Sequence, residues 1–435
     1  MKYKESFYNI EIKKDELGRT LIYNSNTTAL CWFTEDVYSM FKNKNSIDED
    51  DLLPDIIRLG FVVDNKINEI SINDIDRQQY IFNSTPSDMH YIIAPTMTCN
   101  MQCNYCFEKN ADTNKTMTFD DAKKVIKFII DQIKNNPNAK KLYIMWFGGE
   151  PCLASELIIY ISKELIEFTN SRGITYNATI VSNGLLLNKR LAETLKKECK
   201  IRYAQITLDG LADTYAKIKN ISKKSFYKVI ENIENIYNVL GISIRINVNS
   251  NNKKEVKKLI KYLLDDKNLK NKVEIYLAPV RNYQMNNKTN LFSVLEFQKF
   301  KRKITSELIK EGYINSIQHD LRMRSLVSCS SMQMMSAVIG PDLNLYRCEH
   351  CLGKAQYRIG TCEDGFYRNS LDNEFLNYQL LDKCKQCKFL PMCGTGCRED
   401  QIIQKNDTDC EAIKMKLITN ILTYVEYKYR YENNK

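Results

Sequence analysis

From about residue 90 onward, the chain alternates six times between short segments rich in β-forming residues and longer amphipathic segments. The β-rich segments are HYIIAPTMTC, KLYIMWFGGE, TYNATIVSNG, IRYAQITLDG, ISIRINVNS and VEIYLAPVRN. Between them, helical periodicity places residues such as Ile158, Ile161 and Leu165 on one face. Strands separated by such helices pair in parallel through right-handed crossovers, which gives an α/β barrel or an open sheet. Six units are too few to close an eight-stranded barrel. The sequence therefore predicts an α/β fold with a partial six-stranded barrel over residues 90–312.

The segments that flank this core differ from it. Residues 1–80 predict three strands (FYNIEIKK, RTLIYNS and ALCWFT), then two helices and a last strand, an order that resembles a winged-helix module. After residue 312 the alternation stops, and nine of the fifteen cysteines lie between residues 329 and 410. We expect a cysteine-rich domain over residues 313–435, closed by an amphipathic C-terminal helix.

Composition and charge exclude several classes of protein. No apolar run reaches the ~18 residues of a membrane span, and the charged N-terminus is unlike a signal peptide, so we expect a cytoplasmic protein without membrane contact. The net charge of +10 does not indicate nucleic-acid binding, because residues 1–90 carry −6 and the positive excess follows solvated helix faces. In the cytosol, fifteen cysteines and only three histidines favour thiolate-rich zinc or iron–sulfur sites over disulfides.

Three cysteines form the first constellation. Cys99, Cys103 and Cys106 give C-x3-C-x2-C directly after the first predicted barrel strand. Structural zinc sites favour four ligands, and ferredoxin motifs supply four thiolates. Three grouped thiolates instead leave one iron of a four-iron cluster open to a small molecule.

This motif, CNMQCNYC, resembles the signature of the radical S-adenosylmethionine (SAM) enzymes. The resemblance implies that the open iron of a [4Fe-4S] cluster binds SAM and that Tyr105 lies against its adenine. The segment with Gly148, Gly149 and Glu150 is similar to the one that holds the SAM amino group, and the segment with Ser182 and Asn183 is similar to the one that contacts the ribose.

Other strand-end residues match the family more loosely. Arg245 and Asn247 on the fifth strand and Leu277 on the sixth correspond to positions where relatives touch SAM, although strand alternation alone could also explain them. Asp209 resembles a residue of related maturases and could accept a proton from the substrate as a catalytic group. A simple Asp-Gly turn is the alternative.

The C-terminal cysteines resemble the seven-cysteine pattern of the SPASM domain, which holds two auxiliary [4Fe-4S] clusters. A zinc ribbon is the alternative, but it would not explain the C-x5-C-x3-C spacing. The resemblance implies that one cluster is held by Cys384, Cys387, Cys393 and Cys410 and that three corners of the other are held by Cys329, Cys348 and Cys397. The fourth corner is Cys351, which its spacing from Cys348 favours, or Cys362, or an open iron. We expect Cys31, Cys152 and Cys199 to be buried as small apolar residues.

The resemblance extends to residues 1–80, because peptide maturases of this family often begin with a module that binds the leader of a precursor peptide. The leader would add as a strand beside residues 29–34, although the module could instead only pack against the barrel. The expected activity is the formation of an intramolecular thioether or carbon–carbon cross-link in a ribosomally made peptide, with electrons from a flavodoxin- or ferredoxin-type donor. The alternatives are an anaerobic sulfatase-maturing enzyme and a non-catalytic iron–sulfur or zinc protein.

Overall fold

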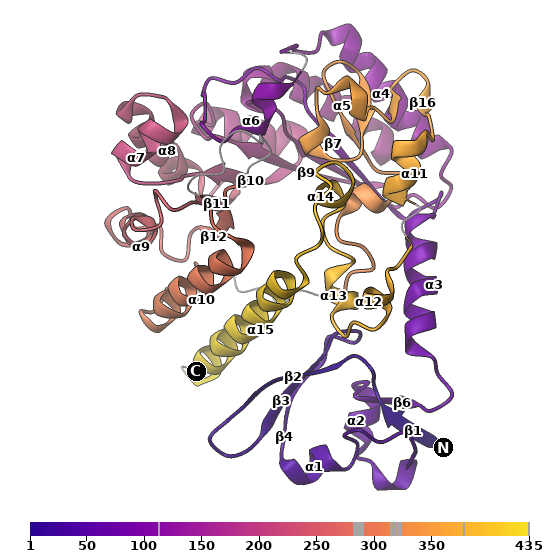
Figure 1. The fold of residues 1–435 in the computed structure, drawn as a ribbon. Helices are drawn as coiled ribbons and strands as arrows, with labels where there is room; N and C mark the ends of the chain where they lie inside the picture. Colours follow the sequence, from indigo (N-terminus) through magenta and orange to yellow (C-terminus); the bar gives the residue numbers. More distant parts are fainter. Residues whose placement is uncertain (112–113, 282–290, 314–315, 317–323, 377–378, 434–435) are drawn as a thin grey trace. The chain divides into compact units, whose positions relative to one another are not determined.

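The computed structural model describes residues 1–111, 114–281, 291–313, 316, 324–376 and 379–433 (Figure 1). The chain forms two compact units. The large unit consists of Asn83–Gln318 and Met334–Leu376. The small unit consists of Met1–Phe82, His319–Gln333 and Asn377–Lys435. The N-terminal and C-terminal residues therefore belong to the same compact unit.

Six consecutive parallel strands form the centre of the large unit, in the segments that the sequence predicts. They are β7 (Asp88–Ile93), β8 (Lys141–Trp146), β9 (Thr175–Ser182), β10 (Ile201–Thr207), β11 (Gly241–Val248) and β12 (Glu274–Pro279). Each strand pairs in parallel with the next along the chain. This confirms the prediction of successive βα units.

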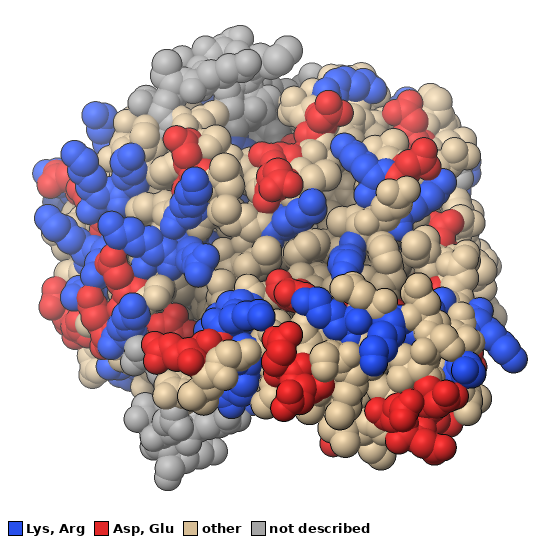
Figure 2. Space-filling view, turned by 60° about the horizontal axis from the view of Figure 1, so that its bottom comes forward, with Lys and Arg blue, Asp and Glu red and all other residues tan. Residues whose placement is uncertain are grey.

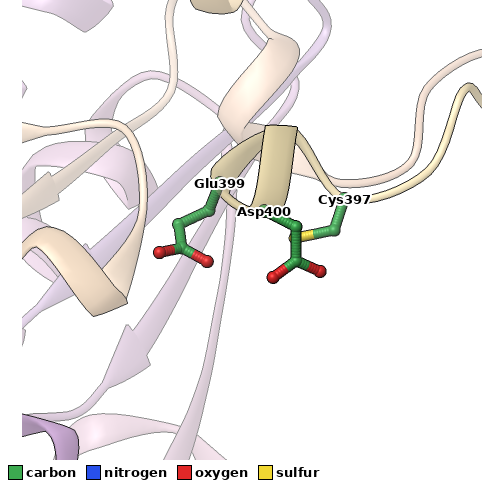
Figure 3. A group of neighbouring side chains, drawn as sticks. All are labelled: Cys397, Glu399 and Asp400. Carbon is green, nitrogen blue, oxygen red and sulfur yellow. The ribbon is translucent and has the colours of Figure 1, made fainter. Parts of the chain in front are cut away.

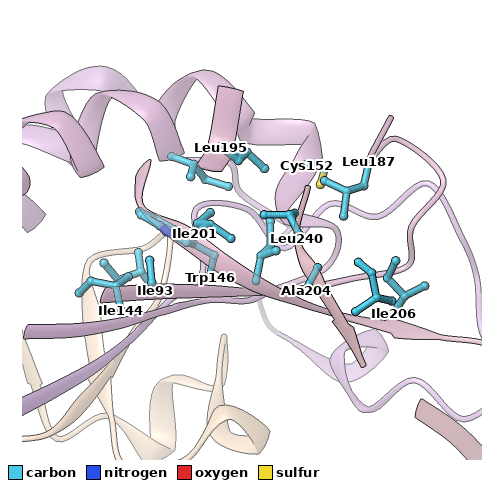
Figure 4. Close-up of a cluster of buried hydrophobic side chains, with 14 of the residues drawn as sticks. Ile93, Ile144, Trp146, Cys152, Leu187, Leu195, Ile201, Ala204, Ile206 and Leu240 are labelled. Carbon is cyan, nitrogen blue, oxygen red and sulfur yellow. The ribbon is translucent and has the colours of Figure 1, made fainter. Parts of the chain in front are cut away.

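Helices that bury one apolar face connect these strands. They are α4 (Phe119–Lys134), α5 (Ser155–Ser171), α6 (Lys189–Cys199), α7 (Ala212–Lys219), α8 (Lys223–Ile236) and α9 (Val256–Lys261), and α10 (Val294–Lys310) follows β12. In α4, Thr118 and Asp121 form a capping box, which fixes where the helix begins. Figure 4 shows how strand residues such as Trp146 and Ile201 share one apolar cluster with Leu195 of α6. Cys152 and Cys199 are buried in this core, as predicted, whereas Cys31, in the small unit, is only partly buried.

Four short strands extend the central sheet beyond β7. They are β13 (Ala337–Ile339), β14 (Asn344–Tyr346), β15 (Gly360–Thr361) and β16 (Gly365–Phe366). Strand β13 pairs in parallel with β7, and the remaining strands follow in antiparallel order. The sequence patterns did not indicate this extension. Part of the cysteine-rich C-terminal region therefore continues the sheet of the large unit.

The small unit contains two three-stranded sheets. The first has the order β5 (Ile47–Asp48), β1 (Lys2–Glu5) and β6 (Val62–Asp64), and the second has the order β2 (Asn9–Lys14), β3 (Thr20–Asn24) and β4 (Leu30–Phe33). The N-terminal helices are α1 (Glu35–Ser39), α2 (Pro54–Arg58) and α3 (Glu69–Ile81). The second sheet and the strand over 62–64 lie where the sequence predicts strands, whereas β1 and β5 were missed.

C-terminal helices complete the core of the small unit. They are α12 (Asp382–Lys385), α13 (Leu390–Cys393), α14 (Arg398–Ile402) and α15 (Cys410–Asn433). Ile10 and Tyr23 of the second sheet pack with Met392 of α13 and with Leu417 and Ile421 of α15. Residues 1–80 therefore share a hydrophobic core with the end of the chain.

The surface carries charges of both signs. On the face shown in Figure 2, Lys and Arg side chains are interspersed with Asp and Glu. Within the described residues, none of the helices is both long and apolar enough to cross a membrane.

Candidate active site and cysteine clusters

The loop after β7 carries the three cysteines of the C-x3-C-x2-C motif, and all three are partly buried. Burial raises the pKa of Cys99 to about 11, with smaller contributions from Glu150, Cys103 and Cys106. Burial likewise raises the pKa of Cys106 to about 11. Thiolates in such a site need a compensating positive charge, which the iron of a cluster supplies. Three neighbouring thiols on one loop therefore fit an iron–sulfur cluster.

Two glycines let the end of β8 pack against this loop. A Cβ atom on Gly148, whose φ is +108°, would lie 2.3 Å from the carbonyl oxygen of Thr96, and one on Gly149 would lie 2.4 Å from that of Thr98. The backbone N–H of Gly149 donates to Thr96 (3.1 Å), and that of Glu150 donates to Thr98 (3.0 Å). The glycines are thus required by close contact with the segment that leads into Cys99.

The Glu150 carboxylate joins this segment to the end of β9. It accepts hydrogen bonds from the hydroxyl of Ser182 (2.8 Å) and from the backbone N–H groups of Asn183 (2.7 Å) and Cys152 (3.0 Å). The Asn183 side chain in turn donates to Asn100 of the cysteine loop (2.7 Å). The structure therefore brings together the three segments that resemble the radical SAM site. The contacts of Glu150 and Ser182 with SAM stay predictions.

The strand ends further along the sheet form a second polar group. Asp209 lies beside Lys219 at 2.7 Å and accepts a hydrogen bond from the Tyr105 hydroxyl. The Asn247 side chain donates to Tyr105 (3.0 Å), and Arg245 donates to Asn247 (2.8 Å). Tyr105, Asp209, Arg245 and Asn247 are therefore linked through side-chain contacts.

Leu277 lies apart from these polar residues. Its side chain belongs to the hydrophobic core and, with Ile260, Ile304 and Leu308, lines a small cavity beside α10. The structure does not bring this side chain to the polar group, and its contact with SAM stays a prediction.

Sequence comparison identifies the central part of the chain. Residues 93–263 match the Radical SAM superfamily. This segment is a radical SAM domain. The chain is 26% identical over 379 residues to the cysteine-type anaerobic sulfatase-maturating enzyme of Clostridium novyi (strain NT). This match covers 77% of this chain and 96% of that enzyme. The chain is also 27% identical over 197 residues to the radical SAM cyclopropyl synthase TigE of Paramaledivibacter caminithermalis, across 42% of this chain and 40% of TigE.

Solved structures share the fold. Native anSMEcpe with bound AdoMet superposes with a TM-score of 0.58 at 18% identity, covering 79% of this chain and 97% of that one. SuiB of Streptococcus suis superposes with a TM-score of 0.52 at 15% identity, covering 91% of this chain and 95% of SuiB. These likenesses confirm the radical SAM α/β fold with its large central sheet.

The structure also reveals residues of the radical SAM domain that the motifs missed. Lys219 is buried against Asp209 and Tyr105, and none of the sequence motifs indicated it. Burial opposes the charge of Lys219, but Asp209 raises its pKa well above the usual value. Glu108 follows the cysteine motif by two residues. Among the described residues, its buried Oε1 atom has no hydrogen-bond partner. Burial, and then repulsion from Glu150, raise the pKa of Glu108 to about 8.

Outside the radical SAM domain, the small unit holds all four cysteines that we assign to one auxiliary cluster: Cys384, Cys387, Cys393 and Cys410. Burial raises the pKa of Cys384, and the thiols of Cys410 and Cys387 raise it further, so these three groups are neighbours. Cys393 ends α13 at a tight turn, where a Cβ atom on Gly394 would lie 2.4 Å from the backbone nitrogen of Ser328. The donor set fits an iron–sulfur cluster.

Cys397, also in the small unit, has two acidic neighbours. One ligand atom from each of Cys397, Glu399 and Asp400 lies within 4.8 Å of the others (Figure 3). All three residues come from the start of α14. The sequence patterns did not indicate the two carboxylates beside this predicted cluster ligand.

Of the remaining cysteines of the pattern, the exposed Cys329 belongs to the small unit, and the large unit contains Cys348, Cys351 and Cys362. The N–H of Cys351 donates to the carbonyl of Cys348 (3.0 Å), so the two residues flank a single turn. Cys362 instead belongs to the hydrophobic core and lies close enough to Tyr91 to affect its pKa. This difference favours Cys351 over Cys362 as a ligand beside Cys348.

Proposed function

We propose that the protein is a radical SAM enzyme that forms an intramolecular cross-link, either a thioether or a carbon–carbon bond, in a ribosomally synthesised precursor peptide. The observation that carries the proposal is the joining of the cysteine loop, the Gly-Gly-Glu segment and the Ser-Asn-Gly segment by the Glu150 and Asn183 hydrogen bonds. The cysteines of the small unit are candidate ligands of an auxiliary cluster, and the edge of β4, which none of the other described strands pairs with, could bind the peptide.

The residues around the cysteine loop have separate tasks in this proposal. Cys99, Cys103 and Cys106 would hold a [4Fe-4S] cluster, which when bound supplies the electron that cleaves SAM to methionine and a 5′-deoxyadenosyl radical. Tyr105 provides an aromatic face for adenine. Glu150 holds the backbone of two strand ends in place, and the surrounding core keeps water from the reacting groups. A flavodoxin- or ferredoxin-type protein would deliver the electron.

The edge of β4 suits the capture of a leader peptide. The Asn24 N–H donates to the Ala29 carbonyl (2.8 Å), so the odd-numbered residues of β4 bond to β3. Leu30 and Trp32 then direct their N–H and C=O groups away from the sheet. Among the described strands, β4 pairs only with β3. An extended peptide can add to such an edge through its main chain.

Both faces of this sheet are already covered within the small unit. Ile22 and Phe33 pack with Phe41 and Phe61, while the opposite face packs on α13 and α15. A peptide can therefore reach the sheet by its edge rather than by a face. Cation–π contacts of Lys13 (5.3 Å) and Arg19 (5.6 Å) hold the ring of Trp32 near that edge.

The cofactor part of the proposal is tested by changing Cys99, Cys103 and Cys106 to Ala. Reconstituted wild type should bind about twelve iron atoms, and the triple variant about eight, with loss of SAM cleavage. Cys199→Ala, a core substitution, should leave the iron content unchanged. Retention of SAM cleavage by the triple variant would end the proposal.

The leader-binding part is tested at Leu30. Leu30→Pro removes an outward N–H without removing a β3 hydrogen bond, whereas Leu30→Ala removes only side-chain atoms. We expect Leu30→Pro to weaken precursor binding about tenfold or more, with SAM cleavage in the absence of peptide unchanged, and Leu30→Ala to bind nearly as wild type. Equal affinities for the two variants would exclude strand addition at β4. Point variants are preferable to deletion of residues 1–80, which would expose Met392, Leu417 and Ile421.

A second candidate function is maturation of a sulfatase, because the match to the Clostridium novyi enzyme covers 96% of that enzyme. Incubation of the reduced protein and SAM with a sulfatase-derived cysteine peptide separates the two functions. We expect no modification of that peptide, and modification would favour the sulfatase-maturing activity.

A further inference from the structure

A buried ion pair connects the cysteine loop to two strand ends of the radical SAM domain. Lys219, the last residue of α7, lies 2.7 Å from the Asp209 carboxylate, and the side chains are only 3% and 0% exposed. Asp209 follows β10 by two residues. Burying a lysine and an aspartate is costly unless each compensates the other, so this pair is sensitive to the loss of either member.

The ion pair and Asn247 together use every hydrogen-bonding position of the Tyr105 hydroxyl. This hydroxyl accepts hydrogen bonds from Lys219 (2.7 Å) and from the side chain of Asn247 (3.0 Å), and it donates to Asp209. A tyrosine hydroxyl has one donor and two acceptor positions, so every position is used. The ammonium of Lys219 also lies 5.2 Å from the centre of the Tyr105 ring. Lys219 therefore contacts both the hydroxyl and the ring of Tyr105.

The last two residues of α7, Ile218 and Lys219, also hold the backbone of the cysteine loop. The N–H of Gln102 donates to the carbonyl of Lys219 (3.1 Å), and the N–H of Asn104 donates to that of Ile218 (3.0 Å). Carbonyls at the end of a helix have no partner within the helix, so they are available for such bonds. The two bonds lie on either side of Cys103. The end of α7 thus fixes both the backbone around one cysteine and the aromatic ring that follows it.

Both carboxylate oxygens of Asp209 take part in contacts within the chain, and the side chain is 0% exposed. Its Oδ1 atom accepts from the backbone N–H of Asn247 (2.8 Å), and its Oδ2 atom contacts Lys219 and Tyr105. Its backbone carbonyl accepts from Asn252 (2.6 Å). These contacts indicate that Asp209 supports Tyr105, and its role as a proton acceptor stays a prediction.

We propose that Lys219 is a positioning residue of the SAM site. Together with Asp209, it fixes the Tyr105 ring and the backbone around Cys103, and it thereby sets the affinity for SAM. This inference rests on the proposed function, because it takes Tyr105 as the residue beside adenine. It goes beyond that function because Lys219 itself need not touch SAM.

The test compares the reconstituted full-length protein with three variants. Lys219→Met removes the charge, Lys219→Arg keeps it, and Lys217→Met changes an exposed lysine on the same helix. The measurements are iron content, KM and kcat for SAM cleavage, and amide hydrogen exchange over residues 99–106. We expect Lys219→Met to raise KM about tenfold or more with a smaller change in kcat, and to accelerate exchange at Gln102 and Asn104. Lys219→Arg should recover part of the affinity, and Lys217→Met should behave as wild type.

An unchanged KM and unchanged loop exchange in Lys219→Met would overturn the inference. If that variant does not fold, the double variant Lys219→Met/Asp209→Asn, which leaves no charge unpaired, is measured in the same way. Hydrogen exchange requires no SAM cleavage. A wild-type protein that fails to cleave SAM would therefore end the proposed function, whereas unchanged exchange and KM in the variants would end only this inference.

Discussion

The backbone N–H of Asn183 donates a hydrogen bond of 2.7 Å to the carboxylate of Glu150, which connects the carboxyl ends of β8 and β9. Glu150 is fully buried, and its carboxylate also accepts hydrogen bonds from the N–H of Cys152 and the hydroxyl of Ser182. The two segments that resemble SAM-binding motifs are therefore one structural element, and a change in either affects both.

Glu150→Gln should weaken this connection. The glutamine amide replaces one acceptor oxygen with a donor, so either the N–H of Asn183 or the N–H of Cys152 faces another N–H group. We expect a loss of about 1–3 kcal/mol in the free energy of unfolding and weaker SAM binding, measured by urea denaturation and equilibrium dialysis. Glu156→Gln, on the exposed side of α5, should change neither. Wild-type stability of Glu150→Gln would show that the carboxylate is not needed for the connection.

We expect His90, which lies on β7 away from the cysteine loop, to make the stability of the protein depend on pH. Its ring stacks on Tyr143 with centroids 4.7 Å apart, and burial lowers its pKa while Asp88 partly opposes this effect. The folded state therefore binds this proton less readily than the unfolded state, and its stability falls as the pH drops through about 6.5. His90→Phe retains an aromatic ring and should remove this contribution. Urea denaturation at several pH values between 5.5 and 7.5 measures the difference. Parallel pH profiles of the two proteins would contradict the prediction.

The predictable part of the fold is local. Each of the six parallel strands is a continuous β-rich segment that ends in turn residues, so pattern alone locates it. Strands β13 to β16 have two or three residues each, and they exist because β13 pairs with β7 from more than 240 residues earlier in the chain. No periodicity can develop over so few residues.

In the candidate site, too, local features could be predicted from the sequence and long-range contacts could not. Cysteine spacing alone indicates a cluster loop, because the three ligands lie within eight consecutive residues. Lys219 has no such signal. Its burial depends on Asp209 at a strand end and on Tyr105, which precedes it by 114 residues. Glu108 was missed for a related reason, since an acidic residue after a motif is ordinarily exposed.

The product should show a two-electron oxidation. After hydrogen abstraction, a peptide radical can take back a hydrogen atom, as in epimerisation, or lose an electron, as in formation of a cross-link. Only the second course needs an electron acceptor, and the many C-terminal cysteines are consistent with auxiliary clusters in that role. We expect mass spectrometry of the modified precursor to show a loss of about 2 Da per cross-link. An unchanged mass with one deuterium gained in heavy water would indicate epimerisation instead.

Cys351 and Cys362 offer a matched pair for finding the fourth ligand of the auxiliary cluster that we assign to Cys348. Both side chains are buried, with exposed fractions of 2% and 7%, so substitution by Ala removes the same atoms from similar surroundings. Cys351 lies one turn from Cys348, whereas Cys362 packs in the core near Tyr91. Cys351→Ala should therefore alter the electron paramagnetic resonance spectrum of one cluster or lower the iron content. Cys362→Ala should only reduce stability, by about 1–2 kcal/mol. A changed spectrum in Cys362→Ala alone would assign the ligand to Cys362, and unchanged spectra in both variants would leave that iron open to a substrate thiolate.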